Sequence, residues 1–404
     1  MRRPFLVEVE VQTGQRRRLT AAMREGEQVS PLELFFDLVF VLALTQCTQL
    51  MSNHASWGGV GKGLLVLGLL WWAWVGYSWI TSVVDPEDDS VRLVIFAAMA
   101  AMLIVALAVP QAFGGLAFEF AIAYAAVRYG QLGLFMIASR DTPDLRHSVL
   151  TLVGSTTVGV GLLVGGSFLD SNAQVIVWAV ALGLDMAGPY FFGSEGWRLV
   201  PAHFAERHGL ILIIALGESI VAIGVGVGGE LSFGQGAAAV LGVALAAAMW
   251  WLYFDVVALV AARRLARAAV GRVQNEMARD SYSYLHFPMV AGIVLVALGM
   301  KKTLANVDDP LETVPAFALL GGLSAYLMAH VSFRYRHVHT INTRRAALAV
   351  ILLALLPVAT EISALATVAV VTTLVWLLIV VETRSYGEAR ERVRREQFAP
   401  ETSS

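Results

Sequence analysis

Charged residues are scarce in this sequence. Asp, Glu, Lys and Arg together make up 15% of the 404 residues, whereas soluble domains carry about 25%. Hydrophobic residues make up 57%, and the mean hydropathy is +0.67. This balance excludes a soluble globular domain, and we expect an integral membrane protein.

Cysteine is almost absent. Cys47 is the single cysteine, which excludes an intrachain disulfide and argues against a cysteine-based metal site. His203, Glu206 and His208 lack a recognised metal-ligand spacing, so the sequence predicts neither a metal nor a cofactor. Residues 1–29 hold no apolar segment followed by a small-residue cleavage site. We therefore expect no cleavable signal peptide, and the first membrane helix should direct its own insertion.

Long apolar stretches dominate the chain instead. About 20 consecutive apolar residues suffice for a helix to cross a bilayer. The sequence predicts an all-α polytopic membrane protein with about 12 transmembrane helices, at 31–52, 62–84, 91–110, 113–138, 148–169, 173–192, 207–228, 236–262, 284–304, 313–333, 345–359 and 362–382. The last two form the weakest pair, because Pro357 and Glu361 fit either a turn between two spans or a break within one.

The positions of the basic residues test this helix count. All of the 29 Lys and Arg residues except Lys62, Arg128, Lys301 and Lys302 fall on one side of the predicted topology. Loops retained in the cytoplasm are enriched in positive charge, so both termini are predicted to be cytoplasmic. The arginine runs are then determinants of topology, and a nucleic-acid partner is not expected.

The second half of the chain repeats the first. The offset between matching positions grows along the chain, as duplication followed by loop growth would leave it. It is 172 residues between Gln46 and Glu218, 179 between Trp72 and Trp251, and 191 between Phe96 and Phe287. Six helices per half is an even number, so the two tandem repeats should share one orientation and be related by a pseudo-twofold axis along the membrane normal.

These patterns predict five segments. They are a cytoplasmic amino-terminal arm at 1–29, a first six-helix repeat at 30–192, a cytoplasmic linker at 193–206, a second six-helix repeat at 207–382 and a cytoplasmic carboxyl-terminal tail at 383–404.

Two acidic residues enter the first apolar stretch. Ser30-Pro31-Leu32-Glu33 fits a capping box, in which Ser30 caps the helix and Glu33 reaches back to its free backbone N–H. Asp37 lies one turn deeper and has no part in capping. A carboxylate in hydrocarbon costs at least about 2.5 kcal/mol unless it faces a partner or water. Asp37 is therefore either a functional carboxylate or half of a buried pair that fixes the first helix.

Further polar residues fall at a similar depth. At 1.5 Å per residue, Asp37 lies roughly 10 Å inside the cytoplasmic boundary and Glu218 about 16 Å. Asp185 and Asp255 come to roughly 12 Å from the same side, so four carboxylates are expected to gather in the inner half of the membrane.

The candidate coupling residues also include bases. His208 and His286 begin their helices on the same side, and Arg128 is the natural counter-charge for one of the acids. Carboxylates removed from water bind a proton or a cation readily, so this set points to ion or proton coupling.

Three runs resemble one bacterial family. ELFFDLVFVLAL from Glu33, HFAERHGLILIIALGESIVAIG from His203 and YLHFPMVAGIVLVALG from Tyr284 are similar to the bacterial low temperature requirement protein A (LtrA) family. The resemblance covers almost the whole chain and implies a multi-pass protein of the bacterial inner membrane. The matching motif positions are Glu33, Asp37, Glu206, Arg207, His208, Gly209, Glu218, Ser219, His286 and Pro288.

A fainter similarity points to a channel. The run from Phe35 to Thr45 is similar to the first-helix Phe-Ser-Asp signature of the proton-activated potassium channels. Phe36 stands in place of the serine, and Gly209 stands where those channels have a second aspartate.

These observations predict a proton- or cation-coupled transporter of a small solute, with Asp37 and Glu218 as the leading coupling residues. A cation channel and a membrane-embedded lipid-active or structural factor in cold adaptation are the alternatives. No enzymatic activity is expected. The expected partners are the lipid bilayer and a small solute or cation. Whether the protein forms a homo-oligomer is left open by the sequence.

Overall fold

The computed structural model describes residues 28–191, 196–226 and 231–398. Within these ranges the chain folds into helices without a β-strand. Most of the predicted arm 1–29 lies outside the described residues.

The first half contains six long helices in sequence. They are α1 (Pro31–Asn53), α2 (Trp57–Thr81), α3 (Asp89–Ala108), α4 (Ala117–Ala138), α5 (Pro143–Gly166) and α6 (Ser171–Phe191). A short 3-10 turn at Val109–Gln111 extends α3.

The second half is more broken. Its elements are α7 (Pro201–Gly226), α8 (Phe233–Phe254), α9 (Val257–Arg267), α10 (Arg272–Ala278), the π-helical turn η2 (Arg279–Tyr284), α11 (His286–Ala305), α12 (Thr313–Val338), α13 (Thr343–Ala354), α14 (Leu356–Ala359) and α15 (Ala364–Phe398).

Local sequence signals account for several helix starts. Ser30 and Glu33 form the expected capping box at α1, and Ser232 forms another with Gln235 at α8. Each box satisfies two backbone N–H groups that a helix start would leave without partners. Pro143 begins α5, where its fixed φ angle suits the first helical position.

Three predicted boundaries were wrong. The seventh helix begins at Pro201 rather than at residue 207, so the last six residues of the predicted linker 193–206 are helical. The eighth predicted helix, 236–262, is interrupted at Asp255, where α8 ends. The last helix runs past residue 382 to Phe398 and takes in much of the predicted tail 383–404.

Ten helices in the described part of the chain are long and apolar enough to cross a membrane. The predicted eleventh span is the clearest departure, because residues 345–359 divide into α13 and the four-residue α14. Exposed side chains such as Leu93, Ile176 and Val240 coat the outer helices. Such a surface suits lipid, so the protein is a multi-pass membrane protein.

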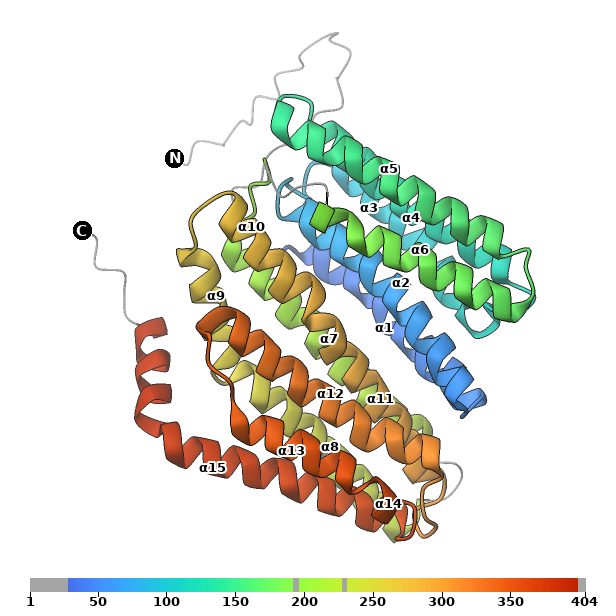
Figure 1. Cartoon of the computed structure of the whole chain (residues 1–404), viewed down its shortest axis with the longest axis vertical. Coiled ribbons are helices and arrows are strands. Elements are labelled where there is room, and N and C mark those ends of the chain that lie inside the picture. The colour runs from blue at the N-terminus through green and yellow to red at the C-terminus, as the bar shows by residue number, and fades with distance from the viewer. Residues whose placement is uncertain (1–27, 192–195, 227–230, 399–404) are drawn as a thin grey trace, which may run out of the picture.

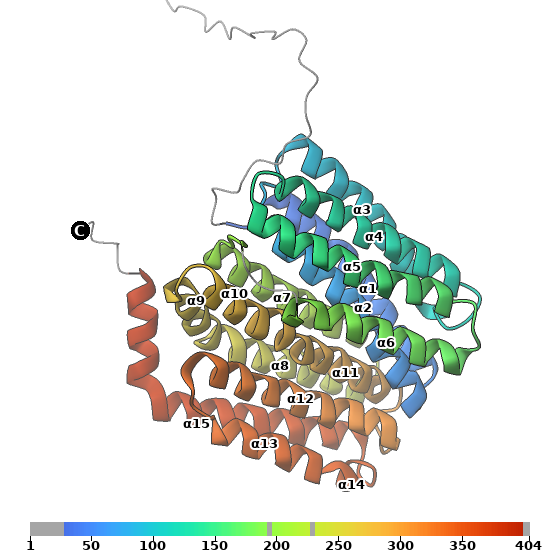
Figure 2. The same ribbon diagram turned by 45° about the horizontal axis from the view of Figure 1, so that its top comes forward.

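The helices of each half lie together, and the two groups meet along α1, α2, α7 and α11 (Figures 1 and 2). The apolar stretches of α2, α12 and the span Arg272–Ala305 that contains α11 are mostly buried, whereas those of α5 and α6 are buried to one third or less. The contact between α1 and α7 therefore lies inside the molecule, and its polar residues must find partners in the protein.

Candidate functional site

Four charged side chains meet where α1 packs on α7. Glu33 and Asp37 come from α1, His203 and Arg207 come from α7, and none is more than 1% exposed. The Arg207 guanidinium donates to both Asp37 carboxylate oxygens at 3.0 Å. Trp74 of α2 donates its indole N–H to the same carboxylate at 2.9 Å. Asp37 is thus a fully compensated buried carboxylate.

Glu33 has two tasks in this cluster. One carboxylate oxygen accepts from the backbone N–H of Ser30 at 2.9 Å, and the other faces His203 Nε2 at 2.8 Å. The Ser82 hydroxyl donates to the backbone oxygen of Ser78 and lies 3.0 Å from His203 Nδ1. His203 therefore links Glu33 of α1 to Ser82 at the end of α2.

A second polar group lies deeper along the same contact. Glu218 of α7 is 1% exposed and accepts a hydrogen bond from Thr45 of α1. Lys301 of α11 donates to Gln49 and interacts electrostatically with Glu218. No salt bridge to Glu218 is formed by the residues that the structure describes. Glu218 is therefore the least compensated of the buried carboxylates discussed here.

The two groups are separated by apolar packing. Asp37 and Thr45 are eight residues apart on α1, which is about 12 Å along the helix axis. Phe40 and Leu44 of α1 and Ile211 and Ala215 of α7 lie between these positions along the two helices, and all four are buried. These side chains offer no hydrogen-bonding group between the two ends of the contact.

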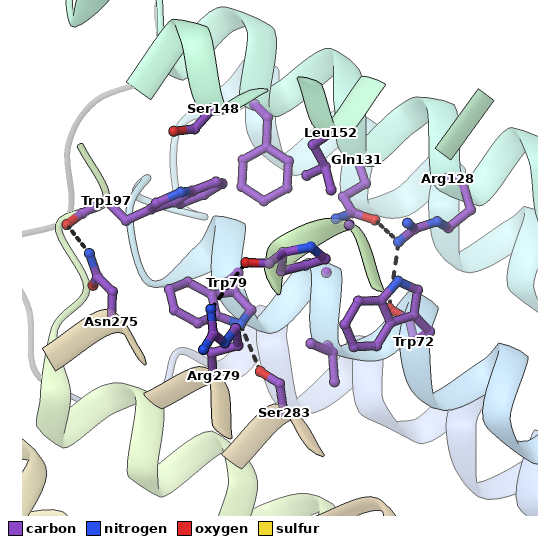
Figure 3. Close-up of a pocket in the computed structure, with 15 residues that line it drawn as sticks. Trp72, Trp79, Arg128, Gln131, Ser148, Leu152, Trp197, Asn275, Arg279 and Ser283 are labelled. Atoms are coloured by element: carbon purple, nitrogen blue, oxygen red, sulfur yellow. Dashed lines mark hydrogen bonds between the residues drawn. The ribbon is translucent and has the colours of Figure 1, made fainter. Parts of the chain in front are cut away.

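Arg128 finds its counter-charge within the first half. It binds Asp185 of α6 with two hydrogen bonds of 2.9 and 2.8 Å. Thr156 of α5 donates to the same carboxylate, and Gln131 accepts from Arg128 at 2.7 Å. These contacts join α4, α5 and α6 at the end of a cavity of about 80 Å³, which Figure 3 shows with tryptophan side chains around it.

His208 and His286 lie side by side between the halves. Both are buried, and their ring centroids are 5.4 Å apart. Nδ1 of each faces a backbone oxygen, so each Nδ1 must be the donor and each Nε2 an acceptor. Tyr253 donates to Nε2 of His286 at 2.8 Å, whereas Nε2 of His208 has no partner among the described residues.

Asp255 lies apart from the other three candidate carboxylates. It follows the last residue of α8 and lines a cavity of about 270 Å³ in the second half. The expectation that four carboxylates gather in one place is therefore wrong. Asp37, Asp185 and Glu218 have different partners, and no contact that we observe joins any two of the four.

The pairing of several site residues was not predicted from the sequence. Arg207 was assigned to a helix start because the α7 boundary was placed six residues late, although Pro201 was a usable signal. Arg345 of α13 and Glu382 of α15 form a further buried ion pair of 2.8 Å. Nothing in the sequence linked these two residues, because pairing across helices depends on how the helices pack.

The family model of the bacterial low temperature requirement A protein (LtrA) matches residues 28–381. The chain belongs to the LtrA family. The resemblance of the three sequence runs is thereby confirmed. In the LtrA structure these runs form α1, α7 and the start of α11, the three helices that hold Asp37, Arg207, Glu218 and His286.

The LtrA chain is also similar to a protein of Rhizobium meliloti (strain 1021), the uncharacterized protein RA0937. The two are 32% identical over 332 residues, which cover 77% of this chain and 80% of the relative. No solved structure matches the LtrA chain.

Proposed function

We propose that this LtrA protein spans the bacterial inner membrane twelve times, as two tandem six-helix repeats of one orientation with both termini in the cytoplasm. The positions of its two cavities support the repeat. Among the long helices, the smaller cavity is lined by α2, α4, α5 and α6, with Trp197, α10 and η2 closing one side, and the larger by α8, α12, α13 and α15 with α9. These are the second, fourth, fifth and sixth spans of each proposed repeat.

Individual residues support the same equivalence. Trp72 lines the smaller cavity and Trp251 the larger, and these tryptophans are 179 residues apart, as the sequence repeat requires. An arginine and a carboxylate pair beside each cavity. The carboxylate comes from the sixth span in both halves, as Asp185 and Glu382. The arginines come from different spans, Arg128 from the fourth and Arg345 from the fifth, so the support comes from the tryptophans and the carboxylates.

We further propose that the protein is a proton- or cation-coupled transporter of a small solute. The burial of Glu218 without a salt bridge carries this proposal. A carboxylate held in this way lowers its free energy by taking up a proton or a cation, and it can release that ion when water reaches it. Glu218 lies between the first helices of the two halves, where relative movement of the halves would alter its surroundings.

The apolar interval favours a carrier over a channel. A channel needs a continuous polar path, whereas the buried residues Phe40, Leu44, Ile211 and Ala215, which lie between Asp37 and Glu218 along α1 and α7, are apolar. In our proposal the Asp37–Arg207 pair closes the inner end of the α1–α7 contact, and Glu218 holds the coupling ion beyond it.

Flux measurements on Glu218→Gln test the proposal. Purified protein is reconstituted into vesicles that contain a pH-sensitive dye, and a potassium diffusion potential is imposed with valinomycin. The wild-type protein should move protons into the vesicles. This flux should occur either without further addition or only after Na⁺ or a solute is added outside. The Gln side chain keeps the size and the contact with Thr45 but cannot hold the ion, so flux should fall at least about tenfold.

Glu119→Gln is the matched control, because Glu119 is an exposed carboxylate in the first turn of α4. It should transport like wild type. Equal flux in wild type and Glu218→Gln would refute the assignment of Glu218. A current that grows without saturation as the ion concentration rises would refute the carrier and favour the channel.

A further inference from the structure

The larger cavity, about 270 Å³, lies in the second half of the molecule, away from the α1–α7 contact. Residues from α8, α9, α12, α13 and α15 line it. It adjoins the break between α8 and α9 and the turn between α12 and α13, so it lies toward one end of the helix bundle.

One charged pair in its wall is already satisfied. Arg345 donates to both Glu382 oxygens at 3.0 and 2.8 Å, and Asn342 donates to the same carboxylate at 2.7 Å. Arg345 also donates to the backbone oxygen of Leu252 and to His330 Nδ1. These groups therefore form a fixed wall, and few of their hydrogen-bonding atoms remain for a ligand.

Arg334 is different. It lines the same cavity, is half-buried, and donates only its Nε–H to Thr340 at 3.0 Å. No salt bridge to Arg334 is formed within the described ranges of the chain. Its two terminal nitrogens therefore remain available in a fork that matches a carboxylate.

The cavity walls also hold hydrogen-bond donors without acceptors. Arginine can only donate, so His330 Nδ1 accepts from Arg345 and the proton of this imidazole is on Nε2. This Nε2–H and the indole N–H of Trp251 are buried donors without a partner among the described residues, and the two ring nitrogens of His337, one a donor and one an acceptor, are buried without a partner as well. Buried donors of this kind are normally satisfied, so acceptor atoms are missing from this region.

Asp255 adds a second carboxylate to the lining, and the rest is apolar. Its aromatic and aliphatic members are Trp251, Leu252, Val256, Val257, Val260, Ala261, Phe333, Val338 and Ile379. A ligand that fits must therefore combine acceptor oxygens and negative charge with a hydrophobic body.

We propose that this cavity binds a small organic carboxylate with an apolar or aromatic tail. The carboxylate contacts Arg334 and accepts from the unpartnered donors, and the tail packs against Trp251 and Phe333. This site is separate from Glu218, and the inference does not depend on the proposed transport.

Equilibrium binding of radiolabelled benzoate to the purified full-length protein tests the site, with no gradient imposed. Benzoate should bind saturably with one site per chain, and succinate and inorganic phosphate should compete weakly because they lack the apolar tail. Arg334→Gln should weaken binding about tenfold or more, since it removes the charge-assisted contact. Trp251→Phe and His337→Phe remove only polar atoms that make no hydrogen bond in the described structure, so they should weaken binding without lowering the thermal unfolding midpoint.

Two matched variants should bind like wild type. Arg267→Gln removes an exposed arginine at the end of α9, and Trp72→Phe changes the equivalent tryptophan beside the smaller cavity. Unaltered binding in Arg334→Gln, the absence of saturable binding, or stabilisation only by phosphatidylglycerol vesicles would overturn the proposal. The last outcome would assign the cavity to a lipid headgroup. None of these outcomes bears on proton flux through Glu218.

Discussion

At the scale of single residues, buried charge in this protein is mostly paired charge. Asp37, Asp185 and Glu382 each face an arginine from another helix. The sequence predicted that buried acids need compensation, and it named Arg128 as one counter-charge. It could not predict which residues pair, because the partners come from helices far apart in the chain.

The Arg128–Asp185 pair should be costly to break and much less costly to replace. Arg128→Met leaves a buried carboxylate without its partner, so the free energy of unfolding should fall by about 3–5 kcal/mol. The double variant Arg128→Met/Asp185→Leu removes both charges and should recover most of that loss. Chemical unfolding of the purified protein, followed by tryptophan fluorescence, would measure both changes.

The exposed pair of Arg92 with Glu87 provides the comparison, because its two side chains are 38% and 51% exposed. Arg92→Met should cost no more than about 1 kcal/mol. If Arg128→Met were as mild, or the double variant were less stable than the single one, the pair would not be the buried contact described here.

At the scale of helices, the sequence located most apolar segments but not their ends. Long hydrophobic runs and capping residues are local signals, which is why α1, α3 and α12 begin within two residues of their predicted starts. The start of α7 was placed at Arg207, six residues late, whereas the helix begins at Pro201 and buries Arg207 against Asp37. The interruption at Asp255 breaks a segment that is apolar on both sides, so hydropathy alone gave no warning.

Close packing of α11 on α12 gives a prediction at this scale. A Cβ atom added at Gly292 would lie 2.5 Å from the backbone oxygen of Gly322, so the helices would have to separate. Gly292→Ala should therefore lower the thermal unfolding midpoint. Gly183→Ala in α6 meets no atom within 4 Å and gains helix propensity worth up to about 1 kcal/mol, so its midpoint should hold or rise. Equal midpoints in the two variants would contradict this packing.

At the scale of the whole molecule, the sequence predicted a helical membrane protein of the LtrA family, and both statements are confirmed. The tandem repeat stays a prediction, although the matching cavities give it structural support. The two cavities themselves could not be foreseen, since each depends on four or more helices coming together. The sequence repeat becomes informative about function only when its matching positions are located among the residues that line the two cavities.

The eleventh span decides the topology of the carboxyl-terminal part. The 17 residues from Thr343 to Ala359 would reach only about 25 Å as a helix, less than a typical hydrocarbon core of about 30 Å. If they nevertheless cross, Ile341 and Glu361 lie on opposite sides and the last span returns the carboxyl terminus to the cytoplasm. If they do not, both residues lie on one side and the repeat is incomplete.

Cysteine labelling in intact cells separates these outcomes. Cys47 is buried, so replacing it with alanine should be tolerated and removes any background. Single cysteines at Ile341 and Glu361, both exposed, are then treated with a membrane-impermeant maleimide. In the twelve-span arrangement position 361 faces outward and position 341 faces the cytoplasm. The cysteine of Glu361→Cys should therefore be labelled in intact cells, and that of Ile341→Cys only after the cells are opened. Asp170→Cys and Asp88→Cys are the outward and inward references, and matching behaviour at positions 341 and 361 would rule out the twelve-span arrangement.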